Sequence, residues 1–298
     1  MCYSTAMGGR IAIGIDVGGT KTAIASYDTA GWKLLKQKRF PTRKDEGFGT
    51  VLEDALSIAD SWKTPDTVAL GCGAPGLIRA TDGSILRMPN IAGGDGFPLK
   101  KYLEKRFGIP VTVENDSNCF TLGEALGGAG KGCNVVVGIT MGTGVGGGIV
   151  VEGKLFRGAD GFAGEIGHML LRPGNPPYET EDSRGEVEQF LSGTAMLKRC
   201  EAAKAAQDLL EGGTCAFLHT EIVLETAWLC TNVTHLINPS IIVFGGGTGR
   251  ALKPYLTTIR DEMTRWIMQG TPLPQLAVAQ LDDPATRGAA MLAYRQVR

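Results

Sequence analysis

The chain has 298 residues, a length that suits about two domains better than one hydrophobic core. A hydrophobic content of 43% and a charged content of 20% exclude an intrinsically disordered chain. The net charge of −1 gives no global field that would favour nucleic acid or an acidic membrane. We therefore expect a globular protein with neither of these partners.

Cysteine usage points to a reducing compartment. The seven cysteines, at positions 2, 72, 119, 133, 200, 215 and 230, form no CxxC pair. Their odd number, without a signal peptide, predicts free buried thiols in a cytoplasmic protein. Residues 1–9 lack an apolar core and are interpreted as a loose extension. The uncharged stretch 134–151 is long enough for a membrane span, but its six glycines favour strand, loop and strand.

Apolar periodicity predicts alternating strands and helices. In chain order we expect strands at 11–16, 21–27 and about 33–40, a helix at about 48–62, a strand at 67–73, a helix at 99–107, a strand at 111–114, and helices at about 117–126 and 285–295.

The opening pattern recurs later in the chain. Segment 139–149 repeats the arrangement of 15–25 at an offset of 124 residues, with a strand, a loop of glycine and threonine, and a second strand. Such a duplication predicts an α/β protein with two domains of like topology facing a central cleft. We expect a smaller N-terminal domain at 1–117 and a larger one at 118–284, with the helix at about 285–298 packing back on the first domain.

The most informative segment is the end of the first strand. An apolar run ends in Asp16 and is followed by Gly18, Gly19, Thr20 and Lys21. Glycines at a strand end let backbone N–H groups turn toward a phosphate, and a carboxylate beside them can hold the water shell of a phosphate-bound Mg²⁺. A plain β-hairpin would look much the same, so the motif needs partners elsewhere.

Four further segments stand at the ends of apolar strands. They are Val113-Glu-Asn-Asp116, Met141-Gly-Thr-Gly144, Gly161-Phe-Ala-Gly-Glu-Ile-Gly-His168 and Ile241-Ile-Val-Phe-Gly-Gly-Gly-Thr248. Because ligands of open α/β sheets sit outside the carboxyl ends of strands, we expect all these sites to converge.

Simpler structural interpretations exist for several of these residues. Asp116 is also a favourable helix N-cap, and the two roles are compatible. His168 alone would be a structural histidine, but its place in Gly-Glu-x-Gly-His favours a ligand contact. Gly142, Gly144 and Gly147 match GxGxxG, yet a strand follows them instead of a helix, which argues against a dinucleotide site.

Together, the segments resemble the ROK family of sugar kinases and repressors, within the actin-like and hexokinase-like ATPase superfamily, over about residues 10–298. The resemblance implies two actin-like (ribonuclease H-like) domains and a homodimer. It also implies phosphorylation of a sugar by ATP with Mg²⁺, with Asp116 as the general base that deprotonates the sugar hydroxyl.

The resemblance also implies the binding residues. The nucleotide site comprises Asp16, Gly18, Gly19, Thr20, Lys21, Thr143, Gly144, Gly245, Gly246 and Gly247, with Asp16 also facing the metal. The sugar site comprises Gly76, Asn90, Asn115, Glu165, His168 and Glu188. Charged and planar hydrogen-bonding groups of this kind suit sugar hydroxyls. Glu188 is supported only by the register of Glu188-Gln-Phe-Leu-Ser-Gly193.

The chain departs from the family pattern after His168. Most members carry a cysteine-rich zinc motif there, whereas residues 169–187 contain no cysteine. We therefore predict no structural zinc, with Pro173, Pro176 and Pro177 stiffening the loop, and His168 as a direct sugar contact. Only about ten residues precede the first strand, so the DNA-binding domain of the family's repressors is not expected.

We predict an ATP-dependent hexose kinase with glucose as the favoured sugar. N-acetylmannosamine, N-acetylglucosamine and fructose stay open as substrates, and polyphosphate stays open as donor. A non-catalytic sugar and ATP sensor is an alternative of another class, against which the retention of Asp116 counts. An actin-like ATPase with a protein partner would lack the Gly-Glu-x-Gly-His segment, and a dinucleotide oxidoreductase is the most distant alternative.

Overall fold

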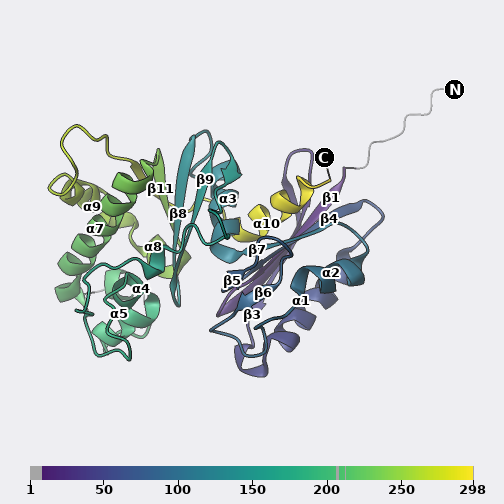
Figure 1. Ribbon diagram of the computed structural model, residues 1–298, viewed down its shortest axis with the longest axis horizontal. Helices are drawn as coiled ribbons and strands as arrows, with labels where there is room; N and C mark the ends of the chain where they lie inside the picture. Colours follow the sequence, from purple (N-terminus) through teal and green to yellow (C-terminus); the bar gives the residue numbers. More distant parts are fainter. Residues whose placement is uncertain (1–8, 206–207, 212, 298) are drawn as a thin grey trace. The chain divides into compact units, whose positions relative to one another are not determined.

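The computed structural model describes residues 9–205, 208–211 and 213–297, which form two compact units (Figure 1). Unit 1 comprises the described parts of Met1–Cys119 and Ala285–Arg298, and unit 2 comprises those of Phe120–Pro284. Cys2 and nearly all of the predicted N-terminal extension lie outside the described residues. No helix in the described ranges combines the length and the hydropathy that crossing a membrane requires.

Unit 1 is built on a five-stranded sheet of order β3-β2-β1-β4-β7. Its strands are β1 (Ile11–Val17), β2 (Lys21–Asp28), β3 (Lys33–Pro41), β4 (Thr67–Ala74) and β7 (Val111–Asn115). The first three strands pair antiparallel, whereas β1, β4 and β7 run parallel. The carboxyl ends of these three parallel strands therefore share one edge of the sheet.

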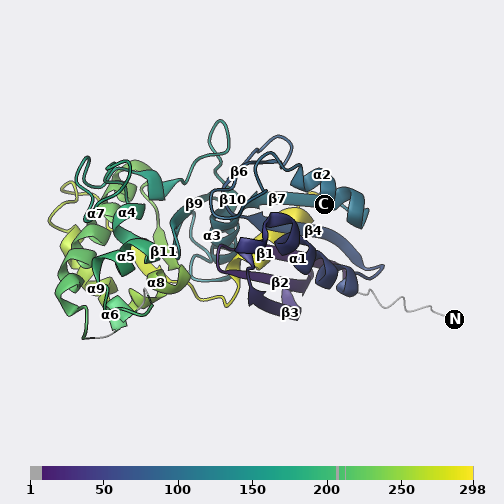
Figure 2. The ribbon, with the colours of Figure 1, turned by 90° about the horizontal axis from the view of Figure 1, so that it is seen from below.

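Helices cover both faces of this sheet (Figures 1 and 2). They are α1 (Phe48–Trp62) and α2 (Leu99–Phe107) on one face, and α10 (Pro284–Tyr294) on the other. Strand alternation sorts the side chains: Ile13 and Ile15 join the core under α1 and α2, and Ala12 packs with Ala290 of α10. The minor elements of this unit are η1 (Lys44–Glu46), β5 (Leu77–Ile78) and β6 (Ile85–Arg87).

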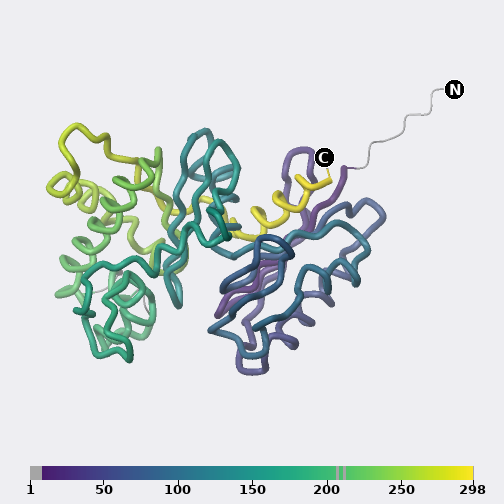
Figure 3. The backbone as a smooth tube through the Cα atoms, viewed as in Figure 1, coloured from purple at the N-terminus to yellow at the C-terminus, as the bar shows by residue number. Residues whose placement is uncertain are grey.

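Small residues let the C-terminal helix approach the sheet closely. A Cβ at Gly14 would overlap the carbonyl of Thr286, and a Cβ at Gly71 would overlap that of Ala289. Figure 3 shows this last, yellow part of the chain returning to the purple N-terminal strands. The two ends of the chain thus build one unit because glycine leaves room for backbone-to-backbone contact.

Unit 2 repeats the architecture of unit 1. Its sheet has the order β10-β9-β8-β11-β12, again with antiparallel pairs first and parallel pairs after them. The strands are β8 (Val135–Met141), β9 (Val145–Val151), β10 (Lys154–Leu155), β11 (Ile241–Gly245) and β12 (Gln275–Val278). The strand–loop–strand prediction for the uncharged stretch 134–151 is confirmed.

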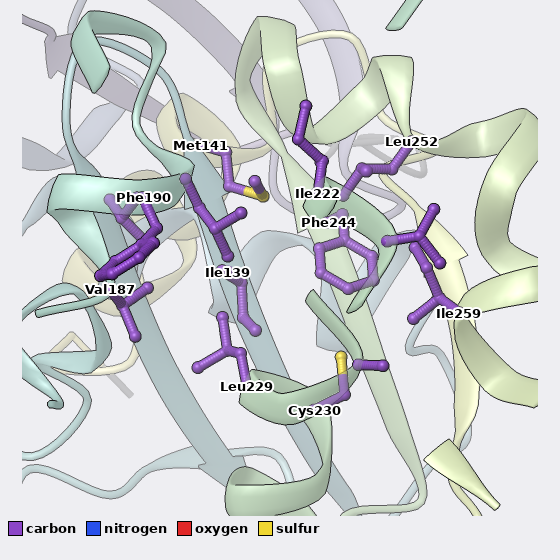
Figure 4. Packing of buried hydrophobic residues seen from close by; sticks show 14 of the residues in the cluster. Ile139, Met141, Val187, Phe190, Ile222, Leu229, Cys230, Phe244, Leu252 and Ile259 are labelled. Carbon is purple, nitrogen blue, oxygen red and sulfur yellow. The ribbon is translucent and has the colours of Figure 1, made fainter. Parts of the chain in front are cut away.

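The core of unit 2 lies between its sheet and its helices. The longer helices are α3 (Asp116–Gly127), which begins in unit 1, α7 (His219–Ile237) and α9 (Leu256–Met263). Shorter ones are α4 (Glu188–Leu191), α5 (Gly193–Arg199), α6 (Asp208–Glu211), α8 (Gly246–Ala251), η2 (Ile166–His168), η3 (Ala216–Leu218) and η4 (Lys253–Tyr255). Figure 4 shows Ile139 and Phe244 of the sheet packed among Ile222 and Leu229 of α7 and Leu252.

The elements predicted in chain order are present, and their ends differ from the predicted ones by at most one residue, except that the C-terminal helix, also placed at about 285–298, ends at Tyr294. The prediction for the cysteines is wrong in part. Cys200 and Cys215 form a disulfide with a Cα–Cα distance of 6.2 Å, which the spacing of 15 residues could not reveal. Cys133 is only half-buried, whereas burial raises the pKa of the Cys72 thiol to about 12 and keeps it protonated.

Candidate active site

Two predicted carboxylates lie at the carboxyl edge of the unit 1 sheet. Asp16 of β1 is in register with Gly73 of β4, which in turn is in register with Glu114 of β7. Asp116 follows directly after β7. A Cβ built on Gly73 would lie 3.5 Å from Asp16 Oδ1 and 3.5 Å from Asp116 Cα. The fold therefore brings Asp16 and Asp116 to opposite sides of one strand end.

The first glycine loop is a tight hairpin held from the end of β3. Gly18 N donates to the carbonyl of Lys21 at 3.1 Å. The Thr42 hydroxyl donates to Gly18 O at 2.8 Å, and Thr42 N donates to Thr20 O at 2.8 Å. Thr20 and Lys21 are exposed, and Gly18 and Gly19 are half-buried. Nothing in the sequence pointed to Thr42, because it lies twenty-one residues after Lys21, the last residue of the loop.

Asn115, not Asp116, caps helix α3. Its Oδ1 accepts hydrogen bonds from Ser117 N at 2.9 Å and Asn118 N at 3.1 Å, and its Nδ2 donates to Gly76 O at 3.1 Å. Asp116 Oδ1 accepts from Ser117 N at 2.7 Å. The interpretation of Asp116 as the N-cap is thus corrected, because its neighbour fills that role. Asp116 itself is half-buried.

A buried glutamate stiffens the same junction. Glu114, which is 7% exposed, accepts hydrogen bonds through Oε1 from Asn115 N and Asn118 Nδ2, both at 3.0 Å. The predicted sugar residue Gly76 has φ +90°, and a Cβ there would overlap the carbonyl of Arg87, the last residue of β6. Asn90 is exposed three residues beyond β6. The sugar roles of Gly76, Asn90 and Asn115 stay predictions.

The second glycine loop is held by a predicted sugar residue. Gly142 N donates to Gly144 O at 3.0 Å, and Val145 N donates to Glu188 Oε2 at 2.7 Å. A Cβ at Gly144 would overlap the Glu188 carboxylate. Helix α5 adds two bonds to the same loop: Gly193 N donates to Gly142 O at 2.6 Å, and a threonine hydroxyl donates to Thr143 O at 2.9 Å.

Gly147, the last glycine of the GxGxxG match, has a packing role. A Cβ at Gly147 would lie 2.7 Å from Gly164 O, and a Cβ at Gly167 would overlap Val145 O. Segment 161–168 therefore rests directly on β9 through backbone contact. This close approach explains the glycine at position 147 without a dinucleotide.

The structure brings three predicted sugar residues of unit 2 together. Burial raises the pKa of the Glu165 carboxyl, nearby His168 lowers it, and Glu188 raises it further. Like charge and burial both disfavour the ionised form. His168 Nδ1 lies 3.1 Å from Glu186 Oε2. Sequence reasoning missed Glu186, which stands two positions from Glu188 and has no distinguishing pattern of its own.

The third glycine group meets the second loop at the edge of the unit 2 sheet. Gly245 of β11 is in register with Thr140 of β8. Gly246 has φ +75°, and a Cβ there would overlap the carbonyl of Met141. Gly247 is exposed. The structure thus gathers Thr143, Gly144 and these three glycines beside adjacent strand ends.

Across the part of the chain that the structure describes, no group of three or more His, Cys, Asp or Glu side chains is arranged to hold a metal ion. The Asp16 carboxylate nevertheless suits Mg²⁺, which keeps several waters and binds through one or two carboxylates and substrate phosphates. The loop that follows His168, residues 169–187, contains no cysteine that could supply a thiolate to a tetrahedral zinc site.

Two sheets of like strand order, each with a glycine loop at its strand ends, define a two-domain, actin-like ATPase fold. The ROK family model matches residues 12–296, and the chain belongs to the ROK family. It is 30% identical to a glucokinase of Thermotoga maritima, over 96% of this chain and 98% of that protein. It is also 30% identical to an N-acetyl-D-glucosamine kinase of Citrobacter koseri, over 94% and 98% of the two chains.

Among solved structures, a ROK family glucokinase from Streptomyces griseus in complex with glucose and AMPPNP is similar, with a TM-score of 0.80 and 30% identity. The similarity covers 96% of this chain and 99% of that one. The predicted family and fold class are confirmed.

Proposed function

We propose that the protein is an ATP-dependent sugar kinase that phosphorylates a hexose, with glucose as the favoured substrate. The observation that carries the proposal is the place of Asp116 at the carboxyl end of β7, beside Asp16 at the same edge of the sheet. A kinase of this type needs one carboxylate to receive the proton and another near the phosphates.

Asp116 is the general base in this proposal. The hydroxyl oxygen of the sugar forms a bond to the γ-phosphorus of ATP, the bond from that phosphorus to the β–γ bridging oxygen breaks, and ADP leaves. Asp116 accepts the proton that the hydroxyl loses, a contribution of about 10²–10⁴ in rate. The bonds that Asn115 and Glu114 make at the start of α3 hold the backbone of Asp116 in place.

Backbone amides of the glycine loops bind the nucleotide. Residues 18–21 and 143–144 face its phosphates and residues 245–247 its adenosine side, as the family resemblance implies. Asp16 is the carboxylate that would hold Mg²⁺ through its water shell. That ion neutralises phosphate charge when bound.

Glu165, His168 and Glu188 bind the hydroxyls of the sugar, with Gly76, Asn90 and Asn115 as further contacts. The influence of His168 and Glu188 on the pKa of Glu165 supports this grouping. An N-acetylhexosamine is the second candidate substrate, since the similarity to an N-acetyl-D-glucosamine kinase equals that to a glucokinase, at 30% identity.

The test is ADP release from Mg·ATP in the presence of glucose, mannose, fructose, N-acetylglucosamine or N-acetylmannosamine. We expect stimulation by glucose, and a loss of about 10²–10⁴ in kcat for Asp116→Asn. Asp66→Asn is the matched control, because Asp66 is exposed just before β4, at the opposite edge of the same sheet.

Stimulation by an N-acetylhexosamine alone would replace glucose and keep the reaction class. Sugar binding without turnover from ATP or polyphosphate would favour the sensor. ATP hydrolysis that no sugar stimulates would contradict the proposal altogether.

A further inference from the structure

The loop that follows His168 stands where most of the family has a zinc motif, and its own residues do not fit that metal. Residues 169–187 contain no cysteine. No metal-holding cluster of His, Cys, Asp or Glu occurs within the described ranges, which include this whole loop. Something other than a metal must therefore order the loop and the histidine beside it.

Backbone pairing closes the two ends of the loop. Leu171 N and Arg172 N both donate to Gly185 O, at 2.9 and 3.0 Å, and Val187 N donates to Met169 O at 2.8 Å. Gly185 has φ +73°, and a Cβ there would overlap the carbonyl of Arg172. The returning strand of the loop is thereby fixed against the segment that carries His168.

The side chain of Gln189 ties the middle of the loop. Its Oε1 accepts from Gly185 N at 2.7 Å and from Glu186 N at 3.3 Å. Its Nε2 donates to Thr180 Oγ1 at 3.2 Å and to Asp182 Oδ1 at 2.8 Å. One primary amide therefore uses both lone pairs and both N–H groups within the loop, and this fixes the backbone at Glu186.

Glu186 directs its carboxylate at His168. Its side chain is 9% exposed, and Oε2 lies 3.1 Å from His168 Nδ1 and 3.6 Å from a guanidinium nitrogen of Arg184. The His168 side chain is 56% exposed. Because an ionised carboxylate only accepts hydrogen bonds, Nδ1 carries the proton, and the neutral ring then presents Nε2 as an acceptor.

We propose that Glu186 is a positioning residue for substrate recognition: it holds His168 in the Nδ1–H tautomer, so that Nε2 accepts a hydrogen bond from a sugar hydroxyl. A carboxylate thus does for this histidine what a metal could do, fixing its orientation and tautomer. The inference rests on the proposed function for its sugar, but the Glu186–His168 pairing can be tested without any substrate.

The first measurement is a long-range ¹H–¹⁵N spectrum of the sugar-free protein at pH about 8.5, where ordinary imidazoles are neutral. His168→Gln assigns the signal among the three histidines. We expect the Nδ1–H tautomer in the wild type and its loss in Glu186→Met, whose side chain is of similar size and has no oxygen to accept the bond. Glu179→Met is the matched control, an exposed glutamate of the same loop. An Nε2–H tautomer in the wild type would overturn the pairing, whatever the enzyme phosphorylates.

The second measurement is steady-state kinetics with glucose. We expect Glu186→Met to lower kcat/KM for glucose about ten- to a hundredfold, chiefly through KM, while KM for ATP is unchanged. In a His168→Gln background the same substitution should add little, because Glu186 acts through the ring. Equal losses with and without His168 would assign Glu186 a general structural role and overturn the proposal. Absence of glucose turnover in the wild type would contradict the proposed substrate, and the tautomer would still decide the pairing.

Discussion

The two glycine loops occupy the same place in two sheets of like strand order, yet different chemistry holds each of them. Val17 pairs with Thr22, so four residues, 18–21, form the first loop. Met141 pairs with Val145, so three residues, 142–144, form the second. The first is anchored by the hydroxyl of Thr42, and the second by the carboxylate of Glu188.

The comparison extends beyond the loops. Unit 2 contains Glu124, a fully buried carboxylate that accepts hydrogen bonds from Ala129 N, Gln280 N and Leu281 N, at 2.8, 3.2 and 2.9 Å. The two units thus share the order of the strands in their sheets, which many sequences can form, but they differ in the side chains that hold the loops. Hydrogen bonds to charged groups are stronger than hydrogen bonds between neutral groups. Removing an anchor of unit 2 should therefore lower the free energy of unfolding more than removing the anchor of unit 1.

The largest effect on stability is expected at Glu124. Glu124→Ala removes the buried carboxylate to which three backbone amides donate and should lower the free energy of unfolding by about 3 kcal/mol. Urea unfolding followed by circular dichroism measures this loss. Glu124→Gln keeps one acceptor oxygen and should lose less. Wild-type stability of the Ala variant would show that the carboxylate is not an anchor.

Glu188→Ala should come next. It removes the charged acceptor of Val145 N, so we expect a loss of about 2 kcal/mol in the free energy of unfolding, together with a higher KM for the sugar. The same urea experiment and sugar kinetics check both effects. In Glu188→Gln the side-chain oxygen can still accept from Val145 N. Relative to Glu188→Ala, Glu188→Gln should therefore regain more of the lost free energy of unfolding than of the lost sugar affinity. If it regained sugar affinity but no stability, the Glu188 side chain would not be the anchor of the second loop.

Thr42→Val tests the neutral anchor of unit 1. The substitution removes the bond to Gly18 O and the 2.8 Å hydroxyl contact with Thr22, while Thr42 N keeps its bond to Thr20 O. A loss of about 1 kcal/mol is expected, smaller than at Glu188. Thr42→Ser, which keeps the hydroxyl, should restore most of it. A larger loss at Thr42 than at Glu188 would reverse the comparison.

The smallest effect concerns pH. The raised pKa of Glu165 means that its carboxylate becomes protonated, as pH falls, before the usual value of 4.5 is reached. If the ionised form accepts a sugar hydroxyl, the acid limb of kcat/KM for the sugar lies above pH 4.5. Glu165→Gln should lower activity and move that limb to lower pH. An unchanged limb would assign it to another group.

The local sequence pattern was sufficient to predict the strands and helices. The apolar runs of 11–16 and 21–27 predict two strands joined by a glycine turn, because a short apolar run bounded by glycines needs no distant partner to be recognised. The recurrence at 139–149 predicts the second sheet for the same reason. Asp116 was expected as a possible N-cap of α3, and only the path of the helix shows that Asn115 fills that role.

The sequence by itself determined the α/β class, the duplicated hairpins, the family, and the polar residues at strand ends, since each of these is written in local periodicity and short motifs. Only the tertiary structure decided which side chains meet. The pairing of Glu186 with His168, the four bonds of Gln189, the anchoring of Val145 by Glu188 and the Cys200–Cys215 disulfide all join positions whose spacing has no period. Such contacts depend on how loops close in space, which hydrophobic pattern does not encode.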